Sequence, residues 1–212
     1  DEIAKKPQTI LDAHGPRSYA YMGGGGQGAH PEALFGRTLL GALGSKYHYT
    51  ALAQELTGLF WAWKQATGHQ FLISDHHNTD VLLALGWNGM MSHQIPQART
   101  FLKRFAKDPD KVLVVVDPRP SNTARIADIH LPIRPGADAL LTKAMIAIIL
   151  HEGWESTDYV ARHVSGLDAI RPWFEDFDAR AAIEVCELDY EQVREVCHLT
   201  ASRRSSMHPD LG

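Results

Sequence analysis

The chain has 212 residues, a hydrophobic fraction of 44% and a formal net charge of −4 at pH 7. This length and composition allow a full α/β core. The mild acidity argues against a nucleic-acid partner, because no basic stripe is present to release phosphate counterions. No apolar run reaches the roughly 18 residues that a membrane-spanning helix needs.

The first notable stretch is YMGGGGQGAH, residues 21–30, which contains the spacing Gly23-x-Gly25-x-x-Gly28. This spacing is typical of a turn that closes a strand and opens a helix over a pyrophosphate. The flanks agree, because residues 18–22 predict a short strand and residues 31–40 predict a helix. A nicotinamide or flavin fold also needs an acidic residue about 20 positions further on, and the segment 44–52 has neither an acid nor a clear strand. The turn therefore either passes close to a bulky anion or is only a tight bend.

Strand and helix patterns alternate along the rest of the chain, which is typical of a parallel sheet covered by helices. The runs at 80–86 and 111–117 are almost continuously apolar, as expected of strands with both faces buried. A shorter strand at 127–133 contains Pro132, which removes one ladder donor and favours an edge position. We therefore predict an α/β fold with an open, mainly parallel Rossmann-like sheet and helices on both faces. The other expected elements are helices over 49–66, 96–107, 137–152, 158–163, 168–174 and 189–202, and a last strand over 204–208.

Two cysteines and a pair of histidines are metal-ligand candidates by residue type alone. Cys186 and Cys197 cannot by themselves supply an iron–sulfur or zinc site, and their spacing matches no common ligand pattern. We expect them to be core thiols or a silent surface pair. Asp75, His76 and His77 are consecutive, but adjacent histidines usually point apart and no third ligand is predictable nearby. We predict no metal at either place.

Polar and conformationally restricted residues gather in the loops that follow the predicted strands. In an open parallel sheet, ligands bind beyond the carboxyl ends of the strands. Three of these loops read GWNGMMSH (86–93), DPRPSNT (117–123) and RPGAD (134–138). Each combines glycine or proline, which restrict the backbone, with polar groups of the kind that contact a nucleotide. Their convergence predicts a nucleotide-binding edge.

Each polar residue of these loops also has an ordinary structural interpretation. Asp117 is either a turn former or an acceptor for ribose hydroxyls or a guanine N–H edge. Arg119 either bridges surface carboxylates or uses its planar fork on a phosphate or a purine carbonyl. Asp138 is either an acid in a first helical turn or the partner of two guanine N–H donors. Ser92 and His93 could simply cap the helix expected near residue 96.

Two longer runs carry a more specific signal: DVLLALGWNGMMSHQIPQARTFLKR (80–104) and KVLVVVDPRPSNTARIADIHLPIRPGADALL (111–141). With Asp-Pro-Arg, Thr-Ala-x-x-Ala-Asp and Pro-Gly-x-Asp in order, the sequence resembles the molybdopterin oxidoreductase family, of the dimethyl sulfoxide reductase and formate dehydrogenase type. In that family, two pseudo-symmetric α/β domains clamp a metal bound by two pterin guanine dinucleotides. The resemblance implies that residues 1–68 are the N-terminal portion of one such domain. Residues 69–212 would be a Rossmann-like domain that binds pterin guanine dinucleotide.

The resemblance also implies roles for individual residues, and the glycine turn at 23–28 would belong to the neighbouring domain's first strand-to-helix loop. The expected cofactor contacts are Gly86, Asn88, Ser92 and His93 along the pyrophosphate, Asp117, Pro118 and Arg119 around the ribose and guanine, and Gly136 with Asp138 at the guanine end. This environment suits a dinucleotide, but not a nicotinamide one.

One position departs from the family pattern. The segment that supplies the metal ligand, usually Cys, selenocysteine, Ser or in some members Asp, aligns with Glu55, next to Gln54. A carboxylate suits a hard, high-valent molybdenum or tungsten ion; otherwise Glu55 is a solvent-exposed helix acid. Leu56 stands where formate dehydrogenases have a histidine, which argues against formate oxidation by the usual route.

The implied function is the cofactor-binding portion of a molybdenum or tungsten bis-pterin guanine dinucleotide oxidoreductase, formate dehydrogenase-like but with an atypical metal-ligand position. We expect a part of a longer polypeptide that is inactive alone, with any iron–sulfur cluster in an N-terminal region that precedes it. The expected partners are the remaining domains of the same polypeptide and an electron-transfer subunit, and the expected location is cytoplasmic. The alternatives are a non-catalytic scaffold subunit that retains the fold without the metal, and a nicotinamide-binding Rossmann protein.

Overall fold

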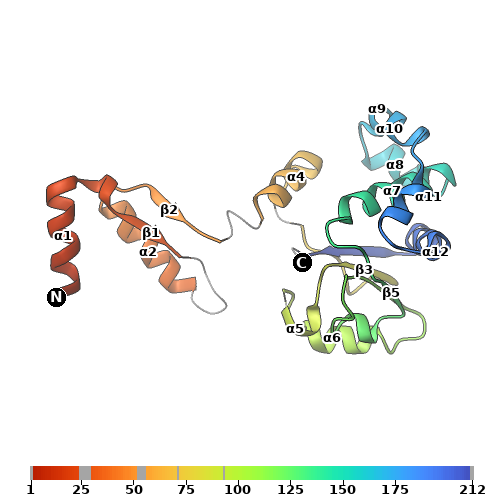
Figure 1. Ribbon diagram of the computed structural model, residues 1–212, viewed down its shortest axis with the longest axis horizontal. Helices are drawn as coiled ribbons and strands as arrows, with labels where there is room; N and C mark the ends of the chain where they lie inside the picture. The colour runs from red at the N-terminus through yellow and green to blue at the C-terminus, as the bar shows by residue number, and fades with distance from the viewer. Residues whose placement is uncertain (1, 24–29, 52–55, 71, 93, 211–212) are drawn as a thin grey trace. The chain divides into compact units, whose positions relative to one another are not determined.

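The computed structural model describes residues 2–23, 30–51, 56–70, 72–92 and 94–210. The chain divides into two compact units, Asp1–Leu72 and Ile73–Gly212 (Figure 1). Each unit has a sheet of its own. None of the helices in the described part of the chain combines the length and the apolar character that crossing a membrane requires.

The first unit is built around a pair of short parallel strands. Its elements are α1 (Glu2–His14), the 3₁₀ turn η1 (Pro16–Ser18), β1 (Ala20–Met22), α2 (His30–Ala42), β2 (Tyr47–Tyr49) and α4 (Thr57–Thr67). Strand β1 pairs with β2 in parallel, and the rings of Tyr21 and His48 stack at 5.3 Å between centroids.

The structure corrects two expectations for this unit. The segment 44–52 does contain a strand, because the Tyr-His-Tyr sequence of β2 pairs with β1 and the ring of His48 packs across the pair on that of Tyr21. The helix expected over 49–66 is described only from Thr57. It ends at Thr67 and is followed by Gly68, whose positive φ of 77° provides a left-handed cap. Helix α1 is an element that the sequence analysis did not anticipate.

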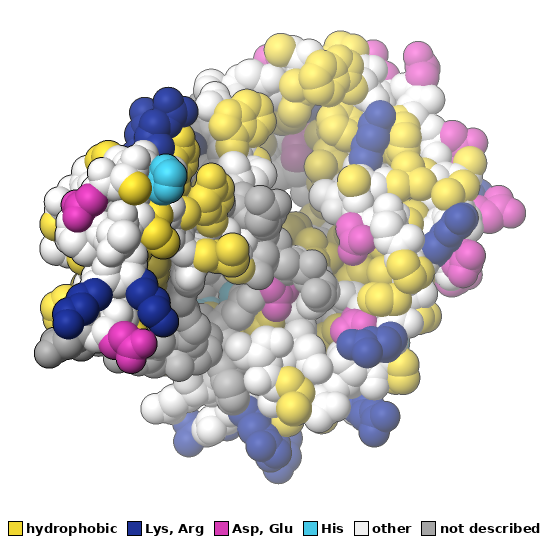
Figure 2. Space-filling model, turned by 60° about the vertical axis from the view of Figure 1, so that its left-hand side comes forward, with side chains coloured by type: hydrophobic (Ala, Val, Ile, Leu, Met, Phe, Trp, Pro, Cys, Tyr) yellow, Lys and Arg dark blue, Asp and Glu magenta, His cyan; other side chains and the backbone are white. Residues whose placement is uncertain are grey.

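The first unit has little core of its own. Among its described side chains only Leu40 and Ser45 are buried. Hydrophobic side chains are visible on the surface of the molecule (Figure 2). In this unit, Met22, Phe35 and Trp61 are 83%, 74% and 66% exposed. Parallel strands normally have both faces covered, and a two-stranded pair is marginal alone, so the described strands add little stability by themselves.

The second unit contains an open, fully parallel sheet of four strands in the order β5-β4-β3-β6. The strands are β3 (Val81–Leu85), β4 (Val112–Val116), β5 (Ile129–Leu131) and β6 (Ser205–Pro209). Strand β5 lies at an edge, as Pro132 predicted. The connecting elements are α5 (Gly89–Ser92), α6 (Ala98–Phe105), η2 (Ala124–Ile126), α7 (Asp138–His151), α8 (Thr157–His163), α9 (Leu167–Ile170), α10 (Pro172–Glu175), α11 (Ala179–Val185) and α12 (Tyr190–Ser202).

Two hydrophobic clusters cover the two faces of this sheet (Figure 1). Leu82 and Ala84 of β3 point to the face that carries α5 and α6. Val81 and Leu83 point to the opposite face, against α7, α11 and α12. This alternation explains why β3 reads as a continuous apolar run, and the predicted fold class is confirmed.

In the second unit, the structure differs from the predicted elements in its short helices. Helices α5 and α11 were not expected, and the single helix expected over 168–174 is divided at Arg171 into α9 and α10. Pro172 follows this break, and it starts a helix well but cannot donate the hydrogen bond that would continue one. Cys186 and Cys197 are both buried in the α7 side of the core, so the first expectation for these thiols is correct.

Candidate functional site

The carboxyl ends of β3, β4 and β5 lie side by side at one edge of the sheet. Leu85 is in register with Val116, and Val116 with Leu131. The residues that follow continue the pairing: the Gly86 N–H donates to the carbonyl of Val116 at 2.8 Å, and the Asp117 N–H donates to that of Leu131 at 3.2 Å. The predicted loops after β3 and β4 therefore start from neighbouring positions. Gly86 has a φ of 65°, a conformation that favours glycine.

Asn88 is held by Thr123 from the next loop. Its Oδ1 accepts from the Thr123 hydroxyl at 3.0 Å and from the Thr123 N–H at 3.3 Å. The same hydroxyl accepts from the N–H of Met90 at 3.1 Å, and Thr123 is completely buried. With Oδ1 occupied by two donors, the amide nitrogen of Asn88 makes no hydrogen bond within the described residues.

Ser92 closes the short helix α5 rather than capping α6. Its N–H donates to the carbonyl of Asn88 at 2.9 Å, and its side chain is exposed. Helix α6 is instead preceded by Gln97, which makes no side-chain cap, so the capping interpretation of Ser92 is wrong. His93, the other residue predicted here, lies outside the described residues.

Asp117 shapes the turn after β4. Its side chain is buried, and Oδ1 accepts from the N–H of Arg119 at 2.8 Å. Its carbonyl accepts from the His130 ring N–H at 2.8 Å. Asp117 therefore forms the turn through one of its two carboxylate oxygens. Pro118 and Arg119 are exposed, and the Arg119 guanidinium forms no hydrogen bond or ion pair with any described residue.

Gly136 and Asp138 lie at the start of α7. Gly136 has a φ of 83°, and a Cβ placed there would meet no atom within 4 Å, so this backbone faces open space. Asp138 is the acid in the first turn of α7, and its carboxylate has no partner among the described residues. Burial, with a smaller contribution from the charge of Asp138, raises the pKa of Cys186. No hydrogen bond in the described part of the chain joins these two residues to Asn88, Asp117 or Arg119.

A network that the sequence analysis did not assign lies where β3 and β6 meet. The strand order reverses between these strands, and such a switch point is where open α/β sheets bind ligands. Trp87 is fully buried, with its ring 4.1 Å from that of His208. The His208 Nε2–H donates to Oε1 of Gln94 at 3.2 Å, and the amide of Gln94 donates to Asp210. The Trp87 indole nitrogen is buried without a partner among the described residues.

The histidine pair at 76–77 packs around a ring instead of forming a ligand set. His76 and His77 lie 5.0 and 5.7 Å from Phe101 between ring centroids. In the part of the chain that the structure describes, no group of three or more His, Cys, Asp or Glu side chains could hold a metal ion. Residues 24–29 of the glycine turn and Glu55 lie outside that part. Of the turn, Gly23 is described, and its N–H donates to the carbonyl of Tyr49 at 3.0 Å.

The family profile described as molybdopterin oxidoreductase matches residues 1–192. The chain belongs to the molybdopterin oxidoreductase family. It is 29% identical over 175 residues to a nitrate reductase of Symbiobacterium thermophilum, covering 79% of this chain and 22% of that protein. It is 26% identical over 215 residues to the acetylene hydratase of Syntrophotalea acetylenica, covering 99% of this chain and 28% of that protein. Formate dehydrogenase H of Escherichia coli is 27% identical over 134 residues, 63% of this chain and 18% of that protein.

The fold is also that of a solved family structure. Acetylene hydratase from Pelobacter acetylenicus superimposes with a TM-score of 0.75 and 24% identity, over 100% of this chain and 28% of that one. This similarity concerns the fold of molybdopterin oxidoreductases. The chain spans less than a third of the length of each of these relatives.

Proposed function

We propose that this chain is the cofactor-binding portion of a molybdenum- or tungsten-dependent oxidoreductase that holds its metal between two pterin guanine dinucleotides. Membership of the family supports the cofactor class, and relatives named nitrate reductase and formate dehydrogenase support redox chemistry. Residues 69–212 would bind one dinucleotide. Residues 1–68 would be part of the neighbouring pterin-binding domain, in agreement with the poorly covered apolar surface of the first unit.

The observation that carries this proposal is the set of unused polar groups at the carboxyl edge of the second unit. The Asn88 amide nitrogen, the Arg119 guanidinium and the Asp138 carboxylate have no partner among the described residues. They offer donors for phosphate oxygens and an acceptor for guanine N–H groups. The open space beside Gly136 would let a flat base approach the backbone. This donor and acceptor set fits a guanine dinucleotide.

The remaining predicted contacts would complete the same surface. Ser92 presents an exposed hydroxyl from α5, and Pro118 fixes the turn that carries Arg119. His93 would lie on the pyrophosphate side, and Glu55 would offer an oxygen ligand to the metal. When bound, the metal and its pterins supply the electron-transfer chemistry. The protein would bind the dinucleotide and orient it.

Replacement of Asp138 tests the guanine assignment. Asp138→Ala removes a charged acceptor, which we expect to cost roughly 2 kcal/mol of binding, about 30-fold in affinity. Asp158→Ala is a matched control, because Asp158 is an exposed first-turn acid of α8 whose one ion pair within the described ranges is with Arg162, one turn on. The measurement is guanosine monophosphate released by acid from the purified complete protein, with circular dichroism to show that both variants fold. Equal nucleotide content in the two folded variants would refute the role of Asp138.

Metal analysis of the complete protein separates the enzyme from the scaffold alternative. About one molybdenum or tungsten per chain is expected for the enzyme, whereas folded protein without metal would support the scaffold. Loss of bound metal in Glu55→Ala, but not in the neighbouring Gln54→Ala, would support Glu55 as ligand. Titration with reduced nicotinamide, followed by fluorescence, should show no binding.

The similarity to acetylene hydratase covers 99% of this chain, and the name of that relative describes addition of water rather than a redox reaction. Hydration is therefore the second candidate activity. The assay is turnover of the complete protein with and without an artificial electron carrier, supplied reduced as a donor or oxidised as an acceptor. A requirement for the carrier in either form supports the oxidoreductase, and turnover without any carrier supports a hydratase.

A further inference from the structure

The end of β6 faces the loop that follows β3. His208 of β6 is in register with Ala84 of β3. Paired residues of neighbouring strands point to the same face of a sheet, so His208 points to the face that carries α5 and α6, as Ala84 does. The loop after β3 is described at residues 86–92 and 94, and its Trp87 belongs to the same hydrophobic cluster as Ala84. An imidazole at the end of β6 is therefore directed at the start of this loop.

The imidazole of His208 contacts the start of the loop through Trp87. The centroids of the two rings lie 4.1 Å apart, and the indole is fully buried. The same indole lies against Gly89, the first residue of α5, because a Cβ built on Gly89 would come within 2.4 Å of the ring. A buried ring in a close-packed core has little room to move. His208 therefore supports Trp87, and Trp87 in turn fixes where α5 begins.

The same imidazole holds Gln94 at the other end of the loop. The amide nitrogen of Gln94 donates to the carboxylate of Asp210, so the amide oxygen of Gln94 is left to accept. This oxygen, Oε1, lies 3.2 Å from Nε2 of His208, so Nε2 carries a proton and donates it. Gln94 has a φ of 30°, a value that non-glycine residues seldom adopt unless their surroundings hold them there.

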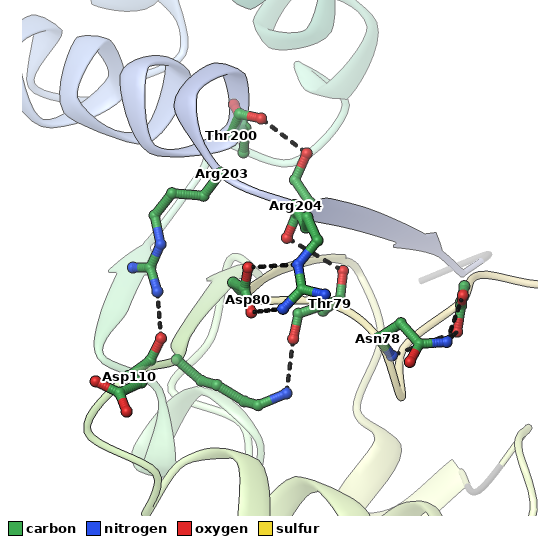
Figure 3. Close-up of polar contacts among 10 residues, drawn as sticks. Asn78, Thr79, Asp80, Asp110, Thr200, Arg203 and Arg204 are labelled. Atoms are coloured by element: carbon green, nitrogen blue, oxygen red, sulfur yellow. Dashed lines mark hydrogen bonds and ion pairs between the residues drawn. The ribbon is translucent and has the colours of Figure 1, made fainter.

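The position of β6 has a separate support at its amino end (Figure 3). Arg204 donates two hydrogen bonds of 2.9 Å to the carboxylate of Asp80, and Arg203 donates to the carbonyl of Asp110. The carbonyl of Arg204 also accepts from the N–H of Asp80 at 2.7 Å. These contacts fasten β6 to the start of β3 without His208. Loss of the imidazole should therefore loosen the loop and leave the sheet intact.

We propose that His208 is a positioning residue that holds both ends of the loop after β3, and with them the dinucleotide contacts that this loop carries. It contacts Trp87 at the start of the loop and Gln94 at its end. Between them lie Asn88 and Ser92, two of the predicted pyrophosphate contacts. A loop that is ordered before the ligand arrives loses less conformational entropy on binding. The proposal rests on the proposed function only for the identity of the ligand.

Hydrogen exchange of the complete protein, followed by peptide mass spectrometry, tests whether His208 orders the loop. In His208→Ala we expect peptides that cover residues 86–95 to exchange at least about tenfold faster than in Asp138→Ala, with no change in peptides of β4. Asp138→Ala keeps every contact of His208 but should lose nucleotide, so it measures the effect of nucleotide loss alone. Equal loop exchange in these two variants would overturn the proposal. Acceleration of β4 to the same extent as the loop would also overturn it, because His208 would then stabilise the whole sheet.

His198→Ala is the matched control for the loss of an imidazole that packs on a tryptophan. The ring of His198 lies 4.9 Å from that of Trp154, and His198 belongs to α12, on the opposite face of the sheet. We expect the loop after β3 to exchange in His198→Ala as it does in the parent protein. Loop exchange as fast in His198→Ala as in His208→Ala would overturn a specific role of His208.

Two conservative substitutions separate the two contacts of the imidazole. His208→Phe keeps a ring against Trp87 but has no donor for Gln94, and His208→Gln keeps a donor but has no ring. We expect His208→Phe to protect the amides of α5 better than His208→Ala does, and His208→Gln to protect the amides around Gln94. Folded variants that restore protection at neither end would contradict the proposal.

The guanosine monophosphate released by acid from the same proteins links loop order to binding. We expect a lower nucleotide content in His208→Ala than in His198→Ala. A loosened loop with an unchanged nucleotide content would overturn the positioning role, because binding would then not depend on the order of the loop. Absence of nucleotide from the parent protein would instead refute the proposed function. The exchange measurement would still decide whether His208 holds the loop, so the two failures are distinguishable.

Discussion

The hydroxyl of Thr123 is predicted to hold the loop after β3 in its binding conformation. In Thr123→Val the shape of the side chain is kept, but the donor to Asn88 Oδ1 and the acceptor for the Met90 N–H are both lost. Leaving a buried N–H without a partner costs about 1–3 kcal/mol, and a hydrogen bond contributes about 1 kcal/mol. We therefore expect the free energy of unfolding to fall by about 2 kcal/mol.

Thr123→Ser is the control, because it keeps the hydroxyl and removes one buried methyl group, at a cost of about 1 kcal/mol. Urea denaturation gives the free energy of unfolding of the three proteins, and hydrogen exchange of the Met90 amide reports on the loop itself. We expect exchange at Met90 to accelerate in Thr123→Val but not in Thr123→Ser. Valine as stable as serine, with Met90 equally protected in both, would refute the role of the hydroxyl.

Three further predictions concern titratable groups. The hydrogen bonds from the Arg204 guanidinium hold the pKa of Asp80 below its usual value. The stabilisation by this ion pair is present above the unfolded pKa of Asp80, about 3.9, and is lost as the pH falls through the folded pKa. Asp80→Asn lacks this titrating group, so its urea midpoint should decline less between pH 7 and pH 3 than that of the parent protein. Burial lowers the pKa of His208, against an opposing effect of Asp210; stability should fall as pH drops below about 6.5, and an NMR titration of His208 at or above that value would contradict this. Burial raises the pKa of Cys197 to about 12, so a thiol reagent at pH 8 should leave it unmodified until the protein is denatured, and rapid labelling of native protein would be inconsistent with this burial.

The second unit could be predicted from sequence because its signals are local and strong. Apolar runs such as Val112–Val116 are continuous only when both faces of a strand are buried, and Pro132 marked the edge strand. The first unit was harder. Strand β2 has three residues, and its stability depends on pairing with β1, a contact that no local pattern reveals. Helix α1 contains Pro7 in its interior, a residue that normally ends or kinks a helix, and no residue of it is buried.

Sequence alone could predict the candidate site only in part. Residue types and loop positions made Asn88, Asp117 and Asp138 candidates, because polar groups after parallel strands share one edge. Thr123 lies in the DPRPSNT loop, but the sequence analysis assigned it no role. Its hydrogen bonds orient Asn88, and no local sequence pattern reveals such a contact. The contact of Trp87 with His208 joins residues that are far apart in sequence, and only the order of the strands brings them together.

The polar groups at the carboxyl edge are of two kinds: some form hydrogen bonds that shape the loops, and others have no partner among the described residues. Asn88 uses its oxygen to accept from Thr123, and Asp117 uses one oxygen to fix the turn that carries Arg119. These bonds immobilise the loops before any ligand arrives, which lowers the conformational entropy lost on binding. The Asn88 amide nitrogen, the Arg119 guanidinium and the Asp138 carboxylate are left without partners among the described residues. The proposed function therefore predicts that substitutions of Asn88, Thr123 or Asp117 change loop order as well as affinity, whereas substitutions of Arg119 or Asp138 change affinity alone.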